Sequence, residues 1–251
     1  MQCVIQSSGL RLSGYLARPA ATPAPGPVPG LVLCHGFPAG PGGAATSGQT
    51  YPELADRLAA DTGWAVLAFN FRGTGASEGD FSLAGWLDDL RAAIDHLLAE
   101  GVSDVWLAGS STGGALAICQ AGEDERVRGV ATLSAPADFS GWADEPERFL
   151  EHARAIGVVR HAAFPPDPAA WARELREIRP VALIGKVPPR PILLIHGADD
   201  DVVRLDDARV LADAAGDAVE LRVLSEAGHR LRHDPRAIAL ILGWMERQAG
   251  T

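Results

Sequence analysis

The chain has 251 residues, of which 47% are hydrophobic, enough to bury the core of one large domain. A formal net charge of -10 and a pI near 5.1 argue against a nucleic-acid partner or an anionic membrane surface. The scattered cysteines Cys3, Cys34 and Cys119 indicate neither a disulfide framework nor a metal site, and they favour a reducing, cytoplasmic setting. Neither a secretory signal nor a membrane-spanning apolar run is indicated, so we expect no membrane partner.

In chain order, the hydrophobic pattern predicts two antiparallel strands and then strands that alternate with helices. A proline-rich stretch from Pro19 to Pro29, typical of a stiff surface connector, separates the two parts. Several of the later strands, namely 30–34, 64–69 and 191–195, have the apolar pattern of parallel strands that are buried on both faces. The expected strands are residues 4–6, 10–17, 30–34, 64–69, 105–108, 127–133, 191–195 and 219–224, and the expected helices are 51–60, 86–98, 206–214 and 235–247.

This alternation predicts an α/β fold with a mostly parallel, doubly wound sheet, helices on both of its faces and antiparallel strands at the N-terminus. Residues 137–186 interrupt the rhythm with two or three short amphipathic helices separated by prolines. We therefore expect a single domain over residues 1–251, with residues 137–186 inserted as a helical cap.

The candidate chemistry begins in the stretch from Val105 to Gln120. Gly109-x-Ser111-x-Gly113 matches the G-x-S-x-G nucleophile elbow, in which a serine sits on a strained turn between a strand and a helix. Glycine relieves the crowding of such a turn, and the helix that follows points backbone N–H groups at a forming anion. The pattern also fits an ordinary turn, so the rest of the chain must supply a base, an acid and an oxyanion pocket.

Candidates for these roles follow other predicted strands, at the edge of the sheet where α/β proteins bind ligands. His229 comes just after the strand 219–224 and is the expected base, whereas Asp199, Asp200 and Asp201 all follow the strand 191–195. The expected oxyanion donors are the backbone N–H groups of Phe37, which follows the strand 30–34, and Thr112, the residue after the serine.

The chain resembles the α/β-hydrolase superfamily over nearly its whole length, and resembles its small esterases and serine aminopeptidase-like members most. The segments that carry this resemblance are His35-Gly36-Phe37-Pro38, the segment from Asn70 to Ser77, Gly109 to Gly114, His196 to Val203, and Ala227-Gly228-His229. The order serine, aspartate, histidine is also the one found in this superfamily.

The resemblance implies roles for particular residues. Relatives commonly carry H-G-x-x-D-x-x-V, which aligns the acid of the triad with Asp200, although a shift to Asp199 or Asp201 stays open. Relatives often begin the arginine-glycine loop with aspartate where this chain has Asn70, and we expect Arg72 to tie loops together below the site. Serine at the elbow favours acyl transfer, because dehalogenases and epoxide hydrolases use aspartate there and dienelactone-hydrolase-like proteins usually use cysteine.

The implied activity is hydrolysis of a small-molecule carboxylic ester through a Ser111-His229-Asp200 triad, with no cofactor and no metal. A peptidase or amidase and a cofactor-free perhydrolase would share these residues, and a non-catalytic binding protein on a hydrolase fold is the alternative of another class. The cap aromatics Trp142, Phe149 and Phe164 are candidate contacts for an apolar or aromatic substrate group, or they simply pack the cap onto the core. The oligomeric state stays open.

Overall fold

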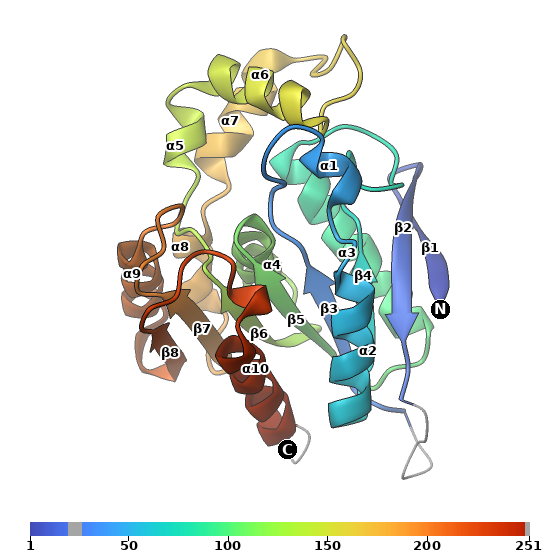
Figure 1. Cartoon of the computed structure of the whole chain (residues 1–251), viewed down its shortest axis with the longest axis vertical. Coiled ribbons are helices and arrows are strands. Elements are labelled where there is room, and N and C mark those ends of the chain that lie inside the picture. The colour runs from blue at the N-terminus through green and yellow to red at the C-terminus, as the bar shows by residue number, and fades with distance from the viewer. Residues whose placement is uncertain (20–26, 249–251) are drawn as a thin grey trace.

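The structure is a computed structural model that describes residues 1–19 and 27–248, so residues 20–26 of the proline-rich connector and residues 249–251 lie outside the described residues. The strands are β1 (Gln2–Ser7), β2 (Leu10–Ala17), β3 (Gly30–Cys34), β4 (Ala65–Phe69), β5 (Val105–Ser110), β6 (Val127–Leu133), β7 (Ile192–Gly197) and β8 (Val219–Leu224). They form one sheet in the order β1-β2-β4-β3-β5-β6-β7-β8 (Figure 1).

Strands β3 to β8 run parallel to one another, whereas β1 and β2 pair in antiparallel fashion and β2 is antiparallel to β4. The expected mostly parallel sheet with antiparallel N-terminal strands is thereby confirmed. Because all the parallel strands end at the same edge, the loops after β3, β5, β7 and β8 are brought together there.

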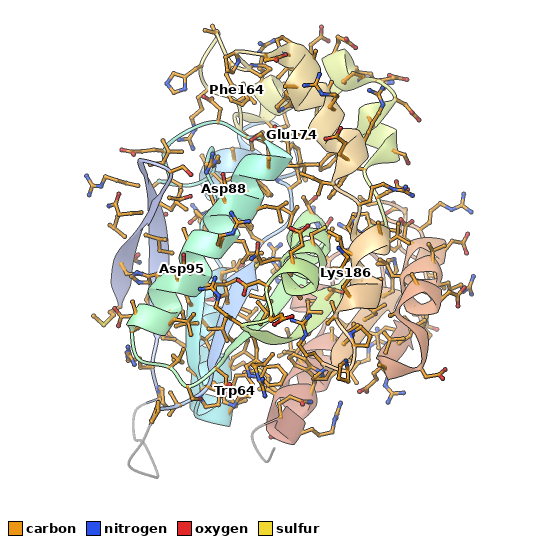
Figure 2. The ribbon with its side chains drawn as sticks, turned by 180° about the vertical axis from the view of Figure 1, so that it is seen from behind. Trp64, Asp88, Asp95, Phe164, Glu174 and Lys186 are labelled. Atoms are coloured by element: carbon orange, nitrogen blue, oxygen red, sulfur yellow. The ribbon has the colours of Figure 1, made fainter. Side chains whose placement is uncertain are left out.

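Helices cover both faces of the sheet. The helices are α1 (Gly43–Thr46), α2 (Tyr51–Thr62), α3 (Leu83–Ala99), α4 (Thr112–Glu123), α5 (Ser140–Ala143), α6 (Pro146–Ile156), α7 (Pro168–Glu177), α8 (Pro180–Leu183), α9 (Leu205–Ala215) and α10 (Pro235–Gln248), with 3-10 turns η1 (Ile184–Lys186), η2 (Gly216–Ala218) and η3 (Leu231–His233). Helices α2 and α10 lie in front of the sheet in Figure 1, and α3 and α4 cover the other face, seen in Figure 2. Within the described ranges, no helix is long and apolar enough to cross a membrane.

Helix α3 begins three residues before the expected start at Trp86, because Ser82 caps it. The Ser82 hydroxyl oxygen accepts a hydrogen bond of 3.0 Å from the backbone N–H of Gly85. Such a cap stabilises a helix by about 1 kcal/mol. The start of the helix is therefore determined by the polar cap residue Ser82, and the apolar stripe of the helix does not reveal it.

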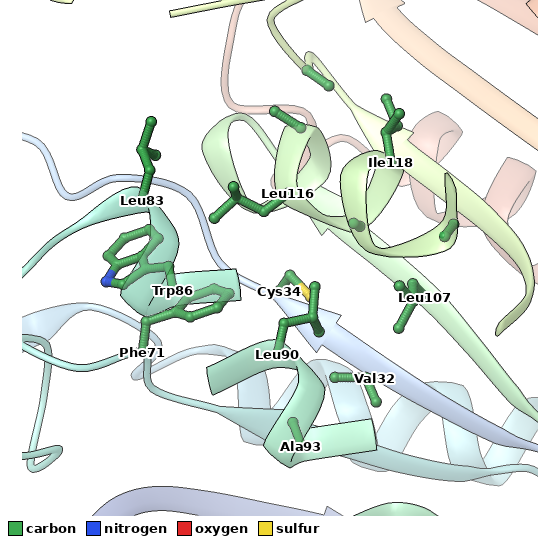
Figure 3. Close-up of a cluster of buried hydrophobic side chains, with 14 of the residues drawn as sticks. Val32, Cys34, Phe71, Leu83, Trp86, Leu90, Ala93, Leu107, Leu116 and Ile118 are labelled. Atoms are coloured by element: carbon green, nitrogen blue, oxygen red, sulfur yellow. The ribbon is translucent and has the colours of Figure 1, made fainter. Parts of the chain in front are cut away.

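Two apolar layers hold the helices on the sheet. The layer under α3 and α4 is built around Phe71 and Trp86, whose rings stack at 4.4 Å, together with Leu90 and Leu116 (Figure 3). The opposite layer contains Trp64, Trp106 and Trp244. Burying a large apolar side chain contributes roughly 1.5–3 kcal/mol. Both layers therefore stabilise the sheet that positions the loops at its carboxyl edge.

An ion pair ties the loop after β4 to α3 and to the N-terminal strands. The guanidinium of Arg72 donates to the carboxylate of Asp89 at 2.7 Å, and Asp89 also accepts from the hydroxyl of Ser7 at 2.6 Å. The Asp89 side chain is wholly buried, and that of Arg72 is only 13% exposed. The expected structural role of Arg72 is thereby confirmed.

Residues 137–186, expected to form the cap, contain more helices than the two or three expected. Helices α5, α6 and α7 lie above the carboxyl edge of the sheet (Figure 1). Helix α8 and η1 instead pack against α4 and α9, within the layer that covers the sheet. The part of this segment that lies over the loops therefore ends with α7.

Candidate active site

Ser111 occupies a strained turn between β5 and α4. Its backbone has φ 51° and ψ -125°, and its N–H donates to the carbonyl oxygen of Leu133 at 2.8 Å. Positive φ is uncommon for a residue with a side chain and costs roughly 1–3 kcal/mol. A Cβ on Gly113 would come within 2.3 Å of the carbonyl oxygen of His35, so glycine is required where the turn meets the loop after β3. The turn thus presents Ser111 at the N-terminus of α4.

His229 lies beside Asp200, although the two residues come from loops after different strands. The Nδ1 atom of His229 lies 2.9 Å from one carboxylate oxygen of Asp200 and 3.1 Å from the other. A carboxylate only accepts hydrogen bonds, so Nδ1 carries the proton and Nε2 keeps its lone pair. The His229 side chain is 20% exposed, whereas that of Asp200 is completely buried.

Asp200 is the acidic residue of its run that faces the histidine. Its carboxylate also accepts hydrogen bonds from the backbone N–H groups of Val202 and Val203, at 3.0 and 2.9 Å. Burial alone would raise the pKa of this carboxyl group, but the hydrogen bonds from His229 and Val203 outweigh burial and lower the pKa to about 2. Asp199 and Asp201 are both exposed, and neither has a hydrogen bond to His229.

Close backbone packing holds the acidic loop against the histidine loop. A Cβ on Gly197, at the end of β7, would come within 2.2 Å of the carbonyl oxygen of Ala227. The N–H of Asp199 donates to that same carbonyl oxygen at 3.0 Å. The ring of His196 is buried, and its Nε2 lies 2.9 Å from the carbonyl oxygen of Val203, so His196 shapes the acidic turn.

Ser111 and His229 line one cavity of about 300 Å³. Phe37 lines it as well, and Thr112, the other expected oxyanion donor, is the buried first residue of α4. A second hollow, of about 500 Å³, shares Ser47, Gly48 and Tyr51 with this cavity but does not include Ser111. The smaller cavity is therefore the one in which a substrate can meet the candidate nucleophile and base.

The three cap aromatics do not line this cavity. Trp142 and Phe149 stack on each other at 4.2 Å and pack over the ring of Phe37, and they border a separate hollow in the cap. Phe164 lies in the cap at the top of Figure 2 and packs against the core. In this conformation Trp142 and Phe149 join the cap to Phe37, and none of the three rings lines the cavity with Ser111.

Sequence reasoning missed several residues around the site. Ser134, which follows β6, is buried with φ 52°, and its hydroxyl lies near Asp200 and contributes to the lowered pKa of that residue without making a hydrogen bond of good geometry. Tyr51 and Arg232 both line the cavity with Ser111. The position of Ser134 just after a strand could have indicated it, but Tyr51 begins helix α2 and Arg232 lies in η3, and no local sequence pattern points to either residue.

The match to known proteins is consistent with this geometry. A model described as the Alpha/beta hydrolase family matches residues 31–240, which is most of the chain. This chain belongs to the α/β-hydrolase family. The hydrolase is also 26% identical over 226 residues to the protein YfhR of Escherichia coli O157:H7, described as uncharacterized, and that match covers 88% of this chain and 70% of YfhR.

Solved structures with a similar fold include esterases. Est1E from Butyrivibrio proteoclasticus with ferulic acid bound matches the hydrolase with a TM-score of 0.72 and 20% identity, covering 98% of this chain and 97% of Est1E. The esterase domain of a Rhodothermus marinus protein matches with a TM-score of 0.70 and 25% identity, covering 99% and 97%. The shared family and these neighbours support a hydrolase.

Proposed function

We propose that this protein is a serine hydrolase that cleaves carboxylic esters of small molecules through a covalent acyl-enzyme. The observation that carries the proposal is the shared cavity of Ser111 and His229, together with the 2.9 Å contact of His229 with buried Asp200. A nucleophile, a base with a free lone pair and an acid that orients the base are the parts that such a reaction needs.

In the proposed first step, Nε2 of His229 takes the Ser111 proton while the Ser111 oxygen bonds to the ester carbonyl carbon. The bond to the alcohol oxygen then breaks, and the alcohol leaves with the proton held by His229. A water molecule attacks the acyl-enzyme in the same manner, releasing the carboxylic acid and restoring Ser111. Asp200 stays ionised throughout, because its pKa is about 2, and stabilises the imidazolium.

Backbone N–H groups of Phe37 and Thr112 are the proposed donors to the oxyanion. Phe37 lines the same cavity as Ser111, and Thr112 follows Ser111 directly and begins a helix of 12 residues, whose N-terminus favours negative charge. Losing one such donor typically raises the activation barrier by roughly 3 kcal/mol, so the positions of both N–H groups should strongly affect the rate.

The test is hydrolysis of p-nitrophenyl acetate and butyrate by the wild type and by Ser111→Ala, with Ser110→Ala as the matched control. We expect Ser111→Ala to lose at least about a thousandfold in kcat and Ser110→Ala to remain active. A fluorophosphonate probe should label the wild type and Ser110→Ala but not Ser111→Ala. Equal hydrolysis by wild type and Ser111→Ala would refute the proposal.

Amides and peroxide in the same assays test the alternatives. Faster cleavage of aminoacyl anilides than of esters would make the protein a peptidase or amidase on the same triad. Peroxide-dependent halogenation would make it a perhydrolase. Absence of labelling and of all hydrolysis would favour a binding protein that uses the cavity without catalysis.

A further inference from the structure

One wall of the cavity that holds Ser111 is cationic, although the chain as a whole has a net charge of -10. Arg230 and Arg232, which follow His229 in the sequence, both line it. Of the described residues that line this cavity, none is an aspartate or a glutamate. The proposed chemistry at Ser111 uses neither arginine, so their position calls for a separate explanation.

Arg232 has unused hydrogen-bonding capacity. Its Nε atom is buried and has no hydrogen-bond partner, and its guanidinium lies 5.6 Å from the ring centroid of Tyr51. Glu53 borders a neighbouring hollow together with Arg232, but among the described residues no carboxylate lies within 4.0 Å of the Arg232 guanidinium. Arg236, in the first turn of α10, is instead paired with Asp234 at 2.7 Å.

Tyr51 adds a second unused donor to this wall. The residue is only 6% exposed, and its buried hydroxyl makes no hydrogen bond of good geometry, although the side chain of Ser110 lies close to it. Burial raises the pKa of Tyr51 to about 12, so the hydroxyl keeps its proton at neutral pH. Buried donors without partners are uncommon because each one destabilises the folded protein, and a ligand that supplies an acceptor would remove that cost.

We infer that Tyr51, Arg230 and Arg232 form a subsite for a carboxylate, so that the preferred substrate is an ester that also carries a free, ionised carboxylate group. This inference rests on the proposed ester hydrolysis at Ser111. The planar guanidinium matches a carboxylate with two parallel hydrogen bonds, and the Tyr51 hydroxyl can donate a third. The cavity of about 300 Å³ places this subsite beside the candidate nucleophile, which suits a short chain between the carboxylate and the ester.

The kinetic test compares esters that differ only in the distal group. Monoethyl glutarate and ethyl pentanoate place a carboxylate or a methyl group in the acyl half, and 4-acetoxybutanoate and butyl acetate do the same in the alcohol half. Release of acid is followed by titration at constant pH. We expect the anionic member of at least one pair to have a kcat/KM at least about tenfold higher than the neutral member. The difference should come mainly from a lower KM, and added salt should reduce it. The pair that shows the gain identifies the half that enters the subsite.

Three variants assign the effect to the subsite. Arg232→Gln should lower the ratio of anionic to neutral kcat/KM by roughly 10- to 100-fold, and Tyr51→Phe, which removes only the hydroxyl, by about threefold to tenfold. Arg236→Gln is the matched control, because Arg236 is paired with Asp234 and does not line the cavity, and its ratio should equal that of the wild type. Tyr51→Phe also keeps the inference testable if Arg232→Gln does not fold.

Binding of glutarate to Ser111→Ala, measured by calorimetry, separates this inference from the proposed function. We expect binding that is lost in the Ser111→Ala, Arg232→Gln double variant. Hydrolysis of the neutral esters without any preference for the anionic ones, and without glutarate binding, would overturn the carboxylate subsite and leave the esterase proposal standing. Glutarate binding that depends on Arg232, without hydrolysis of any ester, would refute the esterase proposal and support the subsite.

Discussion

The backbone N–H of Phe71 donates a hydrogen bond of 3.1 Å to Nε2 of His35. An N–H donor requires a lone pair on Nε2, so the His35 ring is neutral and carries its proton on Nδ1, which lies 2.8 Å from the carbonyl oxygen of Gly36. The ring thereby joins the loop after β3, which contains Phe37, to the loop after β4. Burial lowers the pKa of His35 from 6.5 to about 4, in keeping with a neutral ring.

This neutral histidine predicts a loss of stability in mild acid. The folded pKa is below the unfolded one, so the unfolded chain binds the proton first as pH falls, and the stabilisation is complete only above about pH 6.5. Between pH 7 and 4.5 we expect the wild type to lose about 2 kcal/mol of unfolding free energy through His35. The His35→Gln variant lacks this titrating group. Its unfolding free energy, measured by urea denaturation at the two pH values, should therefore fall by about 2 kcal/mol less than that of the wild type. The same pH dependence in both proteins would contradict the assignment.

Asp200 and its two acidic neighbours offer a matched series for the proposed triad. Asp200→Asn should keep the fold but hold His229 in the wrong tautomer, so we expect kcat to fall on the order of 10³- to 10⁴-fold. Asp199→Asn and Asp201→Asn remove the same charge from exposed positions and should stay within about threefold of the wild type. The measurement is kcat on p-nitrophenyl acetate, and a comparable loss in Asp199→Asn would move the acid to that residue.

Gly113→Ala should damage the elbow. Its methyl group would lie 2.3 Å from the carbonyl oxygen of His35, so either the helix start or the loop that carries Phe37 must shift. We expect a loss of about 1–3 kcal/mol in stability together with most of the esterase activity. Gly141→Ala is the control, because no atom lies within 4 Å of its added methyl group. Thermal unfolding and hydrolysis rates of the two variants should differ clearly, and equal behaviour would contradict this account.

The Arg72–Asp89 pair should matter more than a surface pair. Arg72→Met leaves the buried carboxylate of Asp89 without its cation, which typically costs about 3–5 kcal/mol. Arg57→Met breaks a pair with Asp61 in which both side chains are about half exposed, and should cost no more than about 1 kcal/mol. Urea denaturation of both variants measures the two losses of unfolding free energy. Losses of similar size would show that the buried Arg72 pair stabilises the protein no more than an exposed pair does.

Much of this fold follows from local pattern. The continuous apolar run 30–34 predicted a strand that the structure contains with the same bounds, because a strand buried on both faces needs apolar residues at every position. The start of α3 was placed late, since the cap residue Ser82 lies outside the apolar stripe. Helical periodicity therefore located the body of an element better than its ends.

The sequence by itself determined which loops would carry the candidate chemistry. Ser111 and His229 each follow a parallel strand, and parallel strands deliver their carboxyl ends to one edge of the sheet. The tertiary structure alone decided which carboxylate of the acidic run faces His229, that the cap rings pack over Phe37, and that Tyr51 and Arg232 meet beside Ser111. The direction of a side chain in an irregular loop depends on contacts with distant segments, and no local pattern records those contacts.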